Sequence, residues 1–255
     1  MHAISRKECL LRTALPRFAA PLLMALGVAA APQAHADYVS LTLPQLNVDI
    51  RTYSDGSEYN SFFPSSQTFN GVPFTLALTG PSATCPNGCN VWQVPSDGAS
   101  LTIPVNLYGV TSAYTLINSV FGAYGQTDGT VTFNASGGLI YTVALVQGVN
   151  IRDHYNGYFQ NVIDGVNAVP IDAFPQDFGT AHFDEQIFNL PAAFGTATLD
   201  SIVLTGTWAD GNSYNGVPLI AAATVDVAPV PEPASFGLLG AGLLGFAALM
   251  RRRRS

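Results

Sequence analysis

Short segments with apolar residues at every second position, separated by Gly, Asn and Asp turns, most constrain the fold of this chain. Leu101, Ile103 and Val105 would share one face of an extended chain, because successive side chains of a strand point to opposite sides. No stretch shows the apolar spacing of an amphipathic helix of three turns. Strands are expected over residues 38–43, 48–53, 73–79, 101–110, 130–134, 139–147, 182–188, 198–205 and 217–227.

These strands predict an all-β fold, a single antiparallel β-sandwich of jelly-roll-like type. Pro104 lies inside a predicted strand and indicates an edge strand or a bulge, because proline cannot donate a ladder hydrogen bond. We expect a hairpin around Ser136-Gly137-Gly138 and an ordered loop over residues 121–125. The pattern aromatic-Asn-Gly-Val-Pro-apolar occurs at residues 69–74 and 214–219, and both copies are expected at the same end of the sandwich.

The N-terminal segment, residues 1–36, has the layout of a secretory signal peptide. Basic residues precede an apolar run over residues 18–31, and Ala34-His35-Ala36 forms an A-x-A cleavage site. We expect a signal helix that directs export through the Sec machinery, with cleavage after Ala36. A second membrane helix is the alternative, which Pro21 and the shortness of the run disfavour.

The C-terminal tail, residues 229–255, joins three different segments. Pro231-Glu232-Pro233 is stiff and unsuited to a helix interior. Residues 234–250 carry no charge and, as a helix, would span about 25 Å, near the short limit for a bilayer core. Arg251, Arg252, Arg253 and Arg254 follow, and such a cluster stays on the cytoplasmic side. The tail therefore predicts a transmembrane helix.

These three segments, in this order, resemble the PEP-CTERM sorting signal of Gram-negative bacteria. The resemblance implies recognition at Pro231, Glu232 and Pro233 by an exosortase, a membrane-embedded protease. It also implies removal of the tail, so that membrane attachment is transient and the protein reaches the cell surface or extracellular matrix. A plain C-terminal anchor is the alternative, but an anchor does not require Pro-Glu-Pro.

The exported body, which we define as residues 37–228, is acidic and long enough to form one domain with a core. It contains no lysine, and its basic residues are Arg51 and Arg152, which leaves a net charge near −13. Such a surface repels nucleic acid and anionic lipid. It is compatible with neutral sugars and divalent cations as partners.

Two cysteines of the exported body, Cys85 and Cys89, flank the turn sequence Pro86-Asn87-Gly88. In an oxidising compartment this spacing favours a disulfide that closes a small loop. Half of a metal site is the alternative, but zinc takes four ligands and a second pair is missing from the sequence.

The densest polar cluster is Arg152-Asp153-His154-Tyr155-Asn156-Gly157. Its functional interpretation is a sugar-binding loop in which Tyr155 or Tyr158 stacks on a ring and Asp153 accepts hydroxyl protons. The structural alternative is that Arg152 pairs with Asp153 or another acid and fixes the loop. The strand order and residues 150–155 also resemble the galactose-binding-like jelly-roll domains of bacterial surface proteins.

Two tryptophans and several acids are further candidates. Trp92 and Trp208 could each serve as a carbohydrate platform or in core packing, and Trp208 is the better platform candidate because a loop follows it. Calcium prefers oxygen ligands of the kind found in acidic loops. The acids considered are Asp164, Asp172, Asp177, Asp184 and Glu185. The sequence lacks a D-x-D-x-D-G series, so we assign no calcium or other metal site and expect no cofactor.

Catalytic motifs of the G-x-S-x-G, H-E-x-x-H and phosphate-loop types do not occur in the sequence. We therefore expect a non-enzymatic surface or matrix protein that binds polysaccharide or other matrix components. Two alternatives remain open. One is a structural, self-associating matrix protein, and the other is a glycan-acting hydrolase, since a glycosidase needs only two carboxylates that sequence alone cannot pair.

Overall fold

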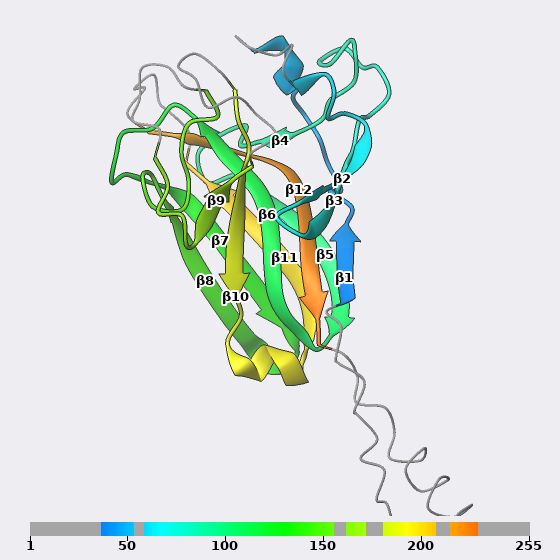
Figure 1. Ribbon diagram of the computed structural model, residues 1–255, viewed down its shortest axis with the longest axis vertical. Coiled ribbons are helices and arrows are strands. Elements are labelled where there is room, and N and C mark those ends of the chain that lie inside the picture. Colours follow the sequence, from blue (N-terminus) through cyan, green and yellow to red (C-terminus); the bar gives the residue numbers. More distant parts are fainter. Residues whose placement is uncertain (1–36, 54–58, 156–161, 172–180, 208–214, 229–255) are drawn as a thin grey trace, which may run out of the picture. The chain divides into compact units, whose positions relative to one another are not determined.

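Two antiparallel β-sheets pack face to face in the computed structural model of the protein (Figure 1). The structure describes residues 37–53, 59–155, 162–171, 181–207 and 215–228, all within the structural unit Ala34–Ser255. The strands are β1 (Asp37–Leu41), β2 (Ser65–Phe69), β3 (Val72–Leu76), β4 (Trp92–Gln93), β5 (Ser100–Tyr108), β6 (Val110–Val120), β7 (Thr127–Ala135), β8 (Leu139–Val146), β9 (Ala168–Pro170), β10 (Asp184–Asn189), β11 (Thr198–Gly206) and β12 (Val217–Val227).

The predicted antiparallel β-sandwich is confirmed by the strand order of the two sheets. The larger sheet has the order β1-β12-β6-β10-β9, with β4 also paired to β12, and the smaller has the order β5-β11-β7-β8. From β5 onward the chain crosses between the sheets at every connection except β7–β8 and β9–β10. This repeated crossing is the jelly-roll-like feature of the fold.

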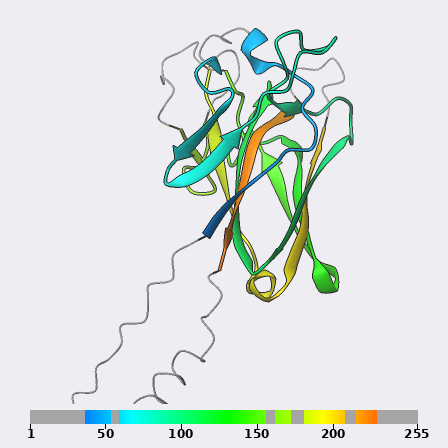
Figure 2. The same ribbon diagram turned by 90° about the vertical axis from the view of Figure 1, so that its right-hand side faces the viewer.

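The larger sheet is buried on both faces. Its inner face and the smaller sheet enclose one apolar core, which includes Phe133, Ile117 and Val225. A second core, which includes Phe74 and Leu219, lies under the β2–β3 hairpin and nearby loops on the outer face. Figure 2 shows this hairpin on one side of β12 and the smaller sheet on the other. Because both faces of β12 are covered, its sequence is almost continuously apolar rather than alternating.

Three details expected from the sequence are confirmed. The strand expected over residues 217–227 is β12. Pro104 lies on β5, an edge strand of the smaller sheet, where the register with β11 shifts between Leu199 and Ser201. Strands β7 and β8 form the expected hairpin, in which Gly137 and Gly138 adopt φ values of 75° and 77°. These positive φ values explain why glycine is needed in that turn.

The strand expected over residues 48–53 is wrong. Ile50–Thr52 instead forms a short 3-10 helix, η1. The Asp49 carboxylate accepts the Arg51 N–H, and the Asp49 carbonyl accepts the Thr52 hydroxyl at 2.7 Å. Such local side-chain and backbone hydrogen bonds compete with the ladder of a sheet.

The repeated Asn-Gly-Val-Pro pattern forms the expected tight turn at its first copy, where Asn70 and Gly71 have φ values of 50° and 88°. The expected common location is wrong. The Pro73 carbonyl accepts the Thr224 hydroxyl at 2.6 Å, near the C-terminal end of β12. The second copy enters β12 at Val217, about 23 Å away at the usual rise per strand residue.

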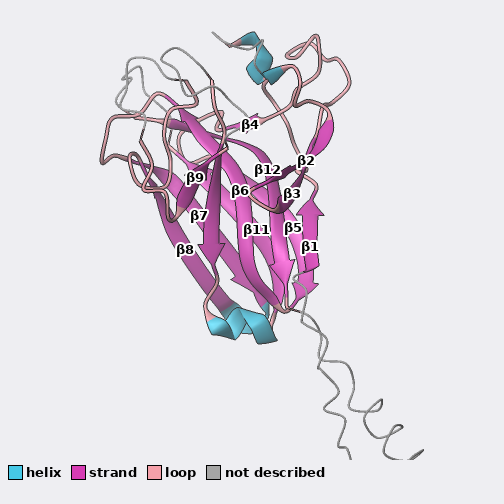
Figure 3. Ribbon diagram, viewed as in Figure 1, coloured by secondary structure: helices cyan, strands magenta, loops and turns pink. Residues whose placement is uncertain are grey.

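The helices of the described residues are short 3-10 segments, η1, η3 (Ser136–Gly138) and η4 (Ala192–Thr196), as Figure 3 shows. No helix in this part of the chain is long and apolar enough to cross a membrane. The signal helix expected over residues 1–36 and the transmembrane helix expected within residues 229–255 lie outside the described residues.

Candidate functional site

A cavity of about 560 Å³ lies where β6 ends, beside η1 and the chain segment that follows β8. Its volume falls within the range of about 300–1,000 Å³ typical of small-molecule sites. The lining residues are Thr52, Tyr53, Val120, Phe121, Asp153, His154 and Tyr155. Three of the residues predicted from sequence, Asp153, His154 and Tyr155, therefore meet at one cavity.

Backbone pairing with the end of β6 positions this segment. The Ser119 N–H donates to the Arg152 carbonyl at 2.9 Å, and the His154 N–H donates to the Ser119 carbonyl at 2.8 Å. Tyr155 continues the segment through an antiparallel bridge to Ala181. The cavity wall is thus fixed by the sheet rather than by a free loop.

Phe121 is the exposed aromatic residue of the cavity, with 44% of its surface accessible. Its backbone is left-handed, with φ of 64°, which is uncommon for a bulky residue. The Phe121 carbonyl accepts the Ser119 hydroxyl at 2.7 Å and the Gln147 amide at 3.2 Å. Its N–H donates to the Asp153 carboxylate. These hydrogen bonds hold the strained backbone that places the ring at the cavity.

The Asp153 carboxylate is buried and lies against the cavity. It accepts the backbone N–H groups of Tyr155, Phe121 and His154. Burial raises the pKa of Asp153 to about 7, and these N–H donors and a nearby carboxylate, Asp128, modify that shift. A carboxylate offers roughly four lone-pair positions, so capacity remains for a donor from a ligand.

A polar network behind Gln147 supports the backbone of Phe121. The Gln147 amide donates to the Ser119 hydroxyl and to the Asp128 carboxylate, and Asp128 also accepts the Gly216 N–H at 3.1 Å. Burial raises the pKa of Asp128 to about 7. Asp128 is not among the described residues that line the cavity.

His154 and His182 are buried and uncharged at neutral pH. Burial, and to a lesser extent the neighbouring His182, lowers the pKa of His154 to about 3. Burial and the charge of Arg152 lower the pKa of His182 to about 3. The Tyr59 hydroxyl lies 3.1 Å from His154 Nδ1, and His182 Nε2 bonds the Asp153 carbonyl. Both rings therefore act as neutral hydrogen-bonding groups.

Arg152, a candidate ligand-binding residue in the sequence prediction, lies in a buried ion pair and is not among the residues that line the cavity. Its guanidinium is buried and holds the Asp184 carboxylate with two hydrogen bonds, Nε to Oδ2 at 2.7 Å and Nη2 to Oδ1 at 2.6 Å. Asn118 Nδ2 donates to the same carboxylate at 2.7 Å. The structural alternative, in which Arg152 pairs with an acid, describes this residue.

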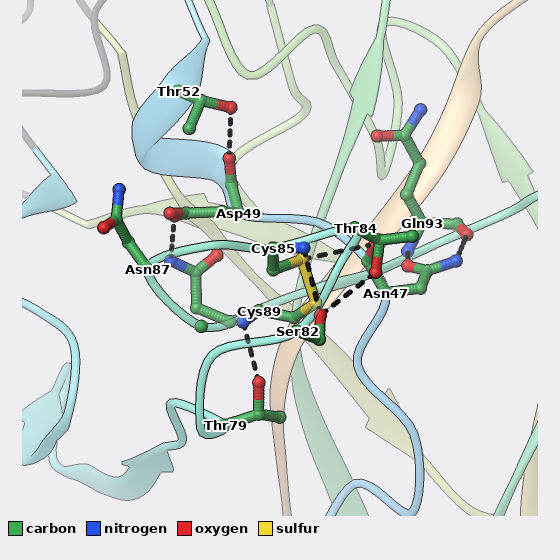
Figure 4. Close-up of a disulfide and its surroundings, with 12 residues drawn as sticks. Asn47, Asp49, Thr52, Thr79, Ser82, Thr84, Cys85, Asn87, Cys89 and Gln93 are labelled. Atoms are coloured by element: carbon green, nitrogen blue, oxygen red, sulfur yellow. Dashed lines mark hydrogen bonds between the residues drawn. A yellow bond between two sulfur atoms is a disulfide. The ribbon is translucent and has the colours of Figure 1, made fainter.

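Figure 4 shows a disulfide in the same region as Asp49 and Thr52, residues at the two ends of the η1 segment. Cys85 and Cys89 form the pairing that the sequence favours, with a Cα–Cα distance of 5.3 Å. Within the loop that they close, the carbonyl of Asn87 accepts Arg51 Nη2 at 2.8 Å. Since Arg51 belongs to η1, the disulfide loop supports the helix that presents Thr52 to the cavity.

The other sequence candidates lie elsewhere or outside the described residues. Trp92 is buried in the core between the sheets. Asp164 accepts backbone N–H groups of its own loop, and Glu185 accepts Asn70 Nδ2 at 2.8 Å. The described residues contain no group of three or more His, Cys, Asp or Glu that could hold a metal ion. Tyr158, Asp172, Asp177 and Trp208 lie outside the described residues.

Sequence reasoning missed Phe121 and Tyr53 as cavity residues. The available signal for Phe121 was an aromatic residue in a Gly-containing turn directly after a long strand. Tyr53 carried no such signal, because it reaches the cavity only through the turn of η1.

Comparison with known proteins finds a sorting motif within the sequence and similar solved structures. No curated protein matches the chain. The solved structure of the CBM35 from Cellvibrio japonicus Abf62 matches with 14% identity and a TM-score of 0.25, over 74% of this chain and 92% of that chain. Residues 229–254 match the PEP-CTERM protein-sorting motif.

The sorting motif covers the C-terminal segment with Pro231, Glu232, Pro233 and the arginine cluster. A motif of this kind implies export, processing by an exosortase and membrane-associated sorting to the cell surface. The chain carries a PEP-CTERM sorting motif and is an exported surface protein.

Proposed function

We propose that this exported protein binds polysaccharide without catalysing a reaction on it, and that the cavity at the end of β6 is the binding site. The observation that carries the proposal is the placement of the exposed Phe121 ring beside the Asp153 carboxylate. A sugar ring has an apolar C–H face that packs on an aromatic ring, and hydroxyl groups that donate to a carboxylate. The cavity offers both kinds of contact together.

Preorganisation of Phe121 supports the same function. Its carbonyl and N–H are engaged by Ser119, Gln147 and Asp153, all within the protein. Ordering an aromatic side chain and its backbone before binding lowers the entropic cost of association. A left-handed backbone at a bulky residue is a feature often retained at functional sites despite its conformational cost.

Hydrolysis is the second candidate, favoured by one observation. The pKa of Asp153, raised to about 7 by burial, suits a general acid. A glycosidase, however, needs two carboxylates that face the same bond. Asp128, the other carboxylate with a pKa of about 7, accepts the Gln147 amide and the Gly216 N–H and is not among the residues that line the cavity. This arrangement supports binding more directly than hydrolysis.

The test is retention of the exported protein on a glycan array and on polysaccharide secreted by the producing cells, followed by calorimetry on the oligosaccharides retained. Phe121→Ala should weaken binding at least about tenfold, as expected for removal of an aromatic anchor. Tyr108→Ala is the matched control, because Tyr108 is 59% exposed and precedes the opposite end of β6. Retention on no glycan, or equal losses in both variants, would refute the proposal.

Product analysis by mass spectrometry separates the two candidates. A binding protein should leave each oligosaccharide intact during prolonged incubation. Cleavage by the wild type that is lost in Asp153→Asn would favour the hydrolase.

A further inference from the structure

The exported body offers no positively charged side chain to a ligand. Its two basic residues, Arg51 and Arg152, are both held by carboxylates, Arg51 Nε by Asp49 at 2.7 Å and Arg152 by Asp184. Its two histidines, His154 and His182, have pKa values lowered to about 3 by burial. An anionic sugar would therefore lose its hydration at the cavity without a cationic partner.

The segments that follow the cavity residues in sequence add no positively charged side chain. Residues 54–58 follow Tyr53, and residues 156–161 follow Tyr155. Their sequences contain no Lys, Arg or His, and the first contains Asp55 and Glu58. The charge argument therefore holds for the whole exported body, because it depends on which residues are present.

The cavity itself contains a carboxylate beside aromatic rings. Asp153 lies against the cavity with Phe121, Tyr53 and Tyr155. An ammonium group is complementary to such a site, because it donates charge-assisted hydrogen bonds to a carboxylate and is attracted to aromatic faces. The net charge near −13 of the exported body also steers polycations toward it.

We propose that the cavity selects polysaccharides carrying free amino groups, such as glucosamine units, over N-acetylated and uronic-acid polysaccharides. This inference rests on the proposed function and names the ligand class of the same site. The ammonium group would donate to Asp153 and favour the ionised form of that carboxyl group, while the sugar ring packs on Phe121. N-acetylation removes the charge of the amino group, and a uronate adds a charge that the exported body repels.

Calorimetry at neutral pH tests the inference with three oligosaccharides of equal length, made of glucosamine, N-acetylglucosamine and glucuronic acid units. The exported protein should bind the glucosamine oligomer at least about tenfold more tightly than the N-acetylated one, the difference expected for one charge-assisted hydrogen bond. Glucuronic acid oligomers should bind most weakly. Glucuronate binding equal to or tighter than glucosamine binding, with or without calcium, would overturn the inference.

Three variants locate the selectivity. Asp153→Asn should abolish the preference for the amino sugar and retain binding of the N-acetylated oligomer, whereas Phe121→Ala should weaken both. Asp200→Asn is the control, because it removes a carboxylate from an exposed position of β11 that does not line the cavity. A preference that survives Asp153→Asn would overturn the inference alone, whereas binding of no oligosaccharide would refute the proposed function itself.

Discussion

Removing the charge of Arg152 tests how much the buried ion pair between Arg152 and Asp184 stabilises the folded protein. In Arg152→Met, the Asp184 carboxylate would lose both guanidinium hydrogen bonds, at 2.6 and 2.7 Å, and would keep the Asn118 amide. Asp184 is 0% exposed, so water cannot replace the lost donors. Breaking a buried ion pair on one side costs about 3–5 kcal/mol, because the remaining charge is left without its partner.

Urea denaturation followed by tryptophan fluorescence measures this loss. A change of about 3–5 kcal/mol would lower the melting temperature by about 6–20 °C in a domain of this size. The double variant Arg152→Met/Asp184→Asn should recover more than half of the loss, since it removes the uncompensated carboxylate.

Arg51→Met is the matched comparison. The Arg51 side chain is 15% exposed, and Asp49 would keep the Asn90 amide and the backbone N–H of residue 51. We expect a loss below about 1 kcal/mol, as is usual for ion pairs near the surface. A loss of similar size in Arg51→Met and Arg152→Met would refute the reasoning that burial decides the cost.

Three further predictions concern the network around the cavity. Asp128 keeps its proton up to about pH 7 in the folded protein, whereas it loses this proton near pH 4 in the unfolded chain. The protonated group therefore stabilises the folded state fully below about pH 4, and this contribution is lost as the pH rises to about 7. The stability of Asp128→Asn relative to wild type should therefore increase as the pH is raised from acidic to mildly alkaline values. A difference between their denaturation midpoints that does not change with pH would contradict this. Replacing Cys85 and Cys89 by serine should lower the free energy of unfolding by about 2 kcal/mol, the chain-entropy value for so small a loop. Denaturation with and without reductant measures this loss, and equal stability of the oxidised protein and the variant would contradict it. Phe121→Gly should relieve about 1 kcal/mol of left-handed backbone strain and leave thermal stability unchanged or higher while oligosaccharide binding is lost; retained binding would show that the ring is not the anchor.

Strand positions were predictable where one face of a strand meets water. In β5 the alternation of Leu101 and Ile103 with exposed residues gives the strand directly, and Pro104 also indicated its edge position. The segment 48–53 alternates equally well, yet the Asp49 side chain closes a 3-10 turn there. Alternation of apolar and polar residues cannot by itself distinguish a strand from a 3-10 turn. The choice depends on whether the local capping hydrogen bond or pairing with a strand distant in sequence is more favourable.

The candidate site was predictable only in part. Asp153, His154 and Tyr155 were found because polar residues are dense in that segment. Arg152 belongs to the same segment, but its partner Asp184 is 32 residues away, so sequence could not decide between a ligand and an ion pair. Phe121 joins the site only because β6 pairs with the segment around Asp153, which is a tertiary contact.

Localised chemical-shift changes during an oligosaccharide titration test the central claim most directly. The exported protein, labelled with nitrogen-15, is titrated with an oligosaccharide that the glycan array retains. We predict saturable shifts at Tyr53, Phe121 and Asp153, with no shift at Tyr108, the last residue of β5, which precedes the opposite end of β6. Saturable shifts confined to residues away from the cavity would contradict the account.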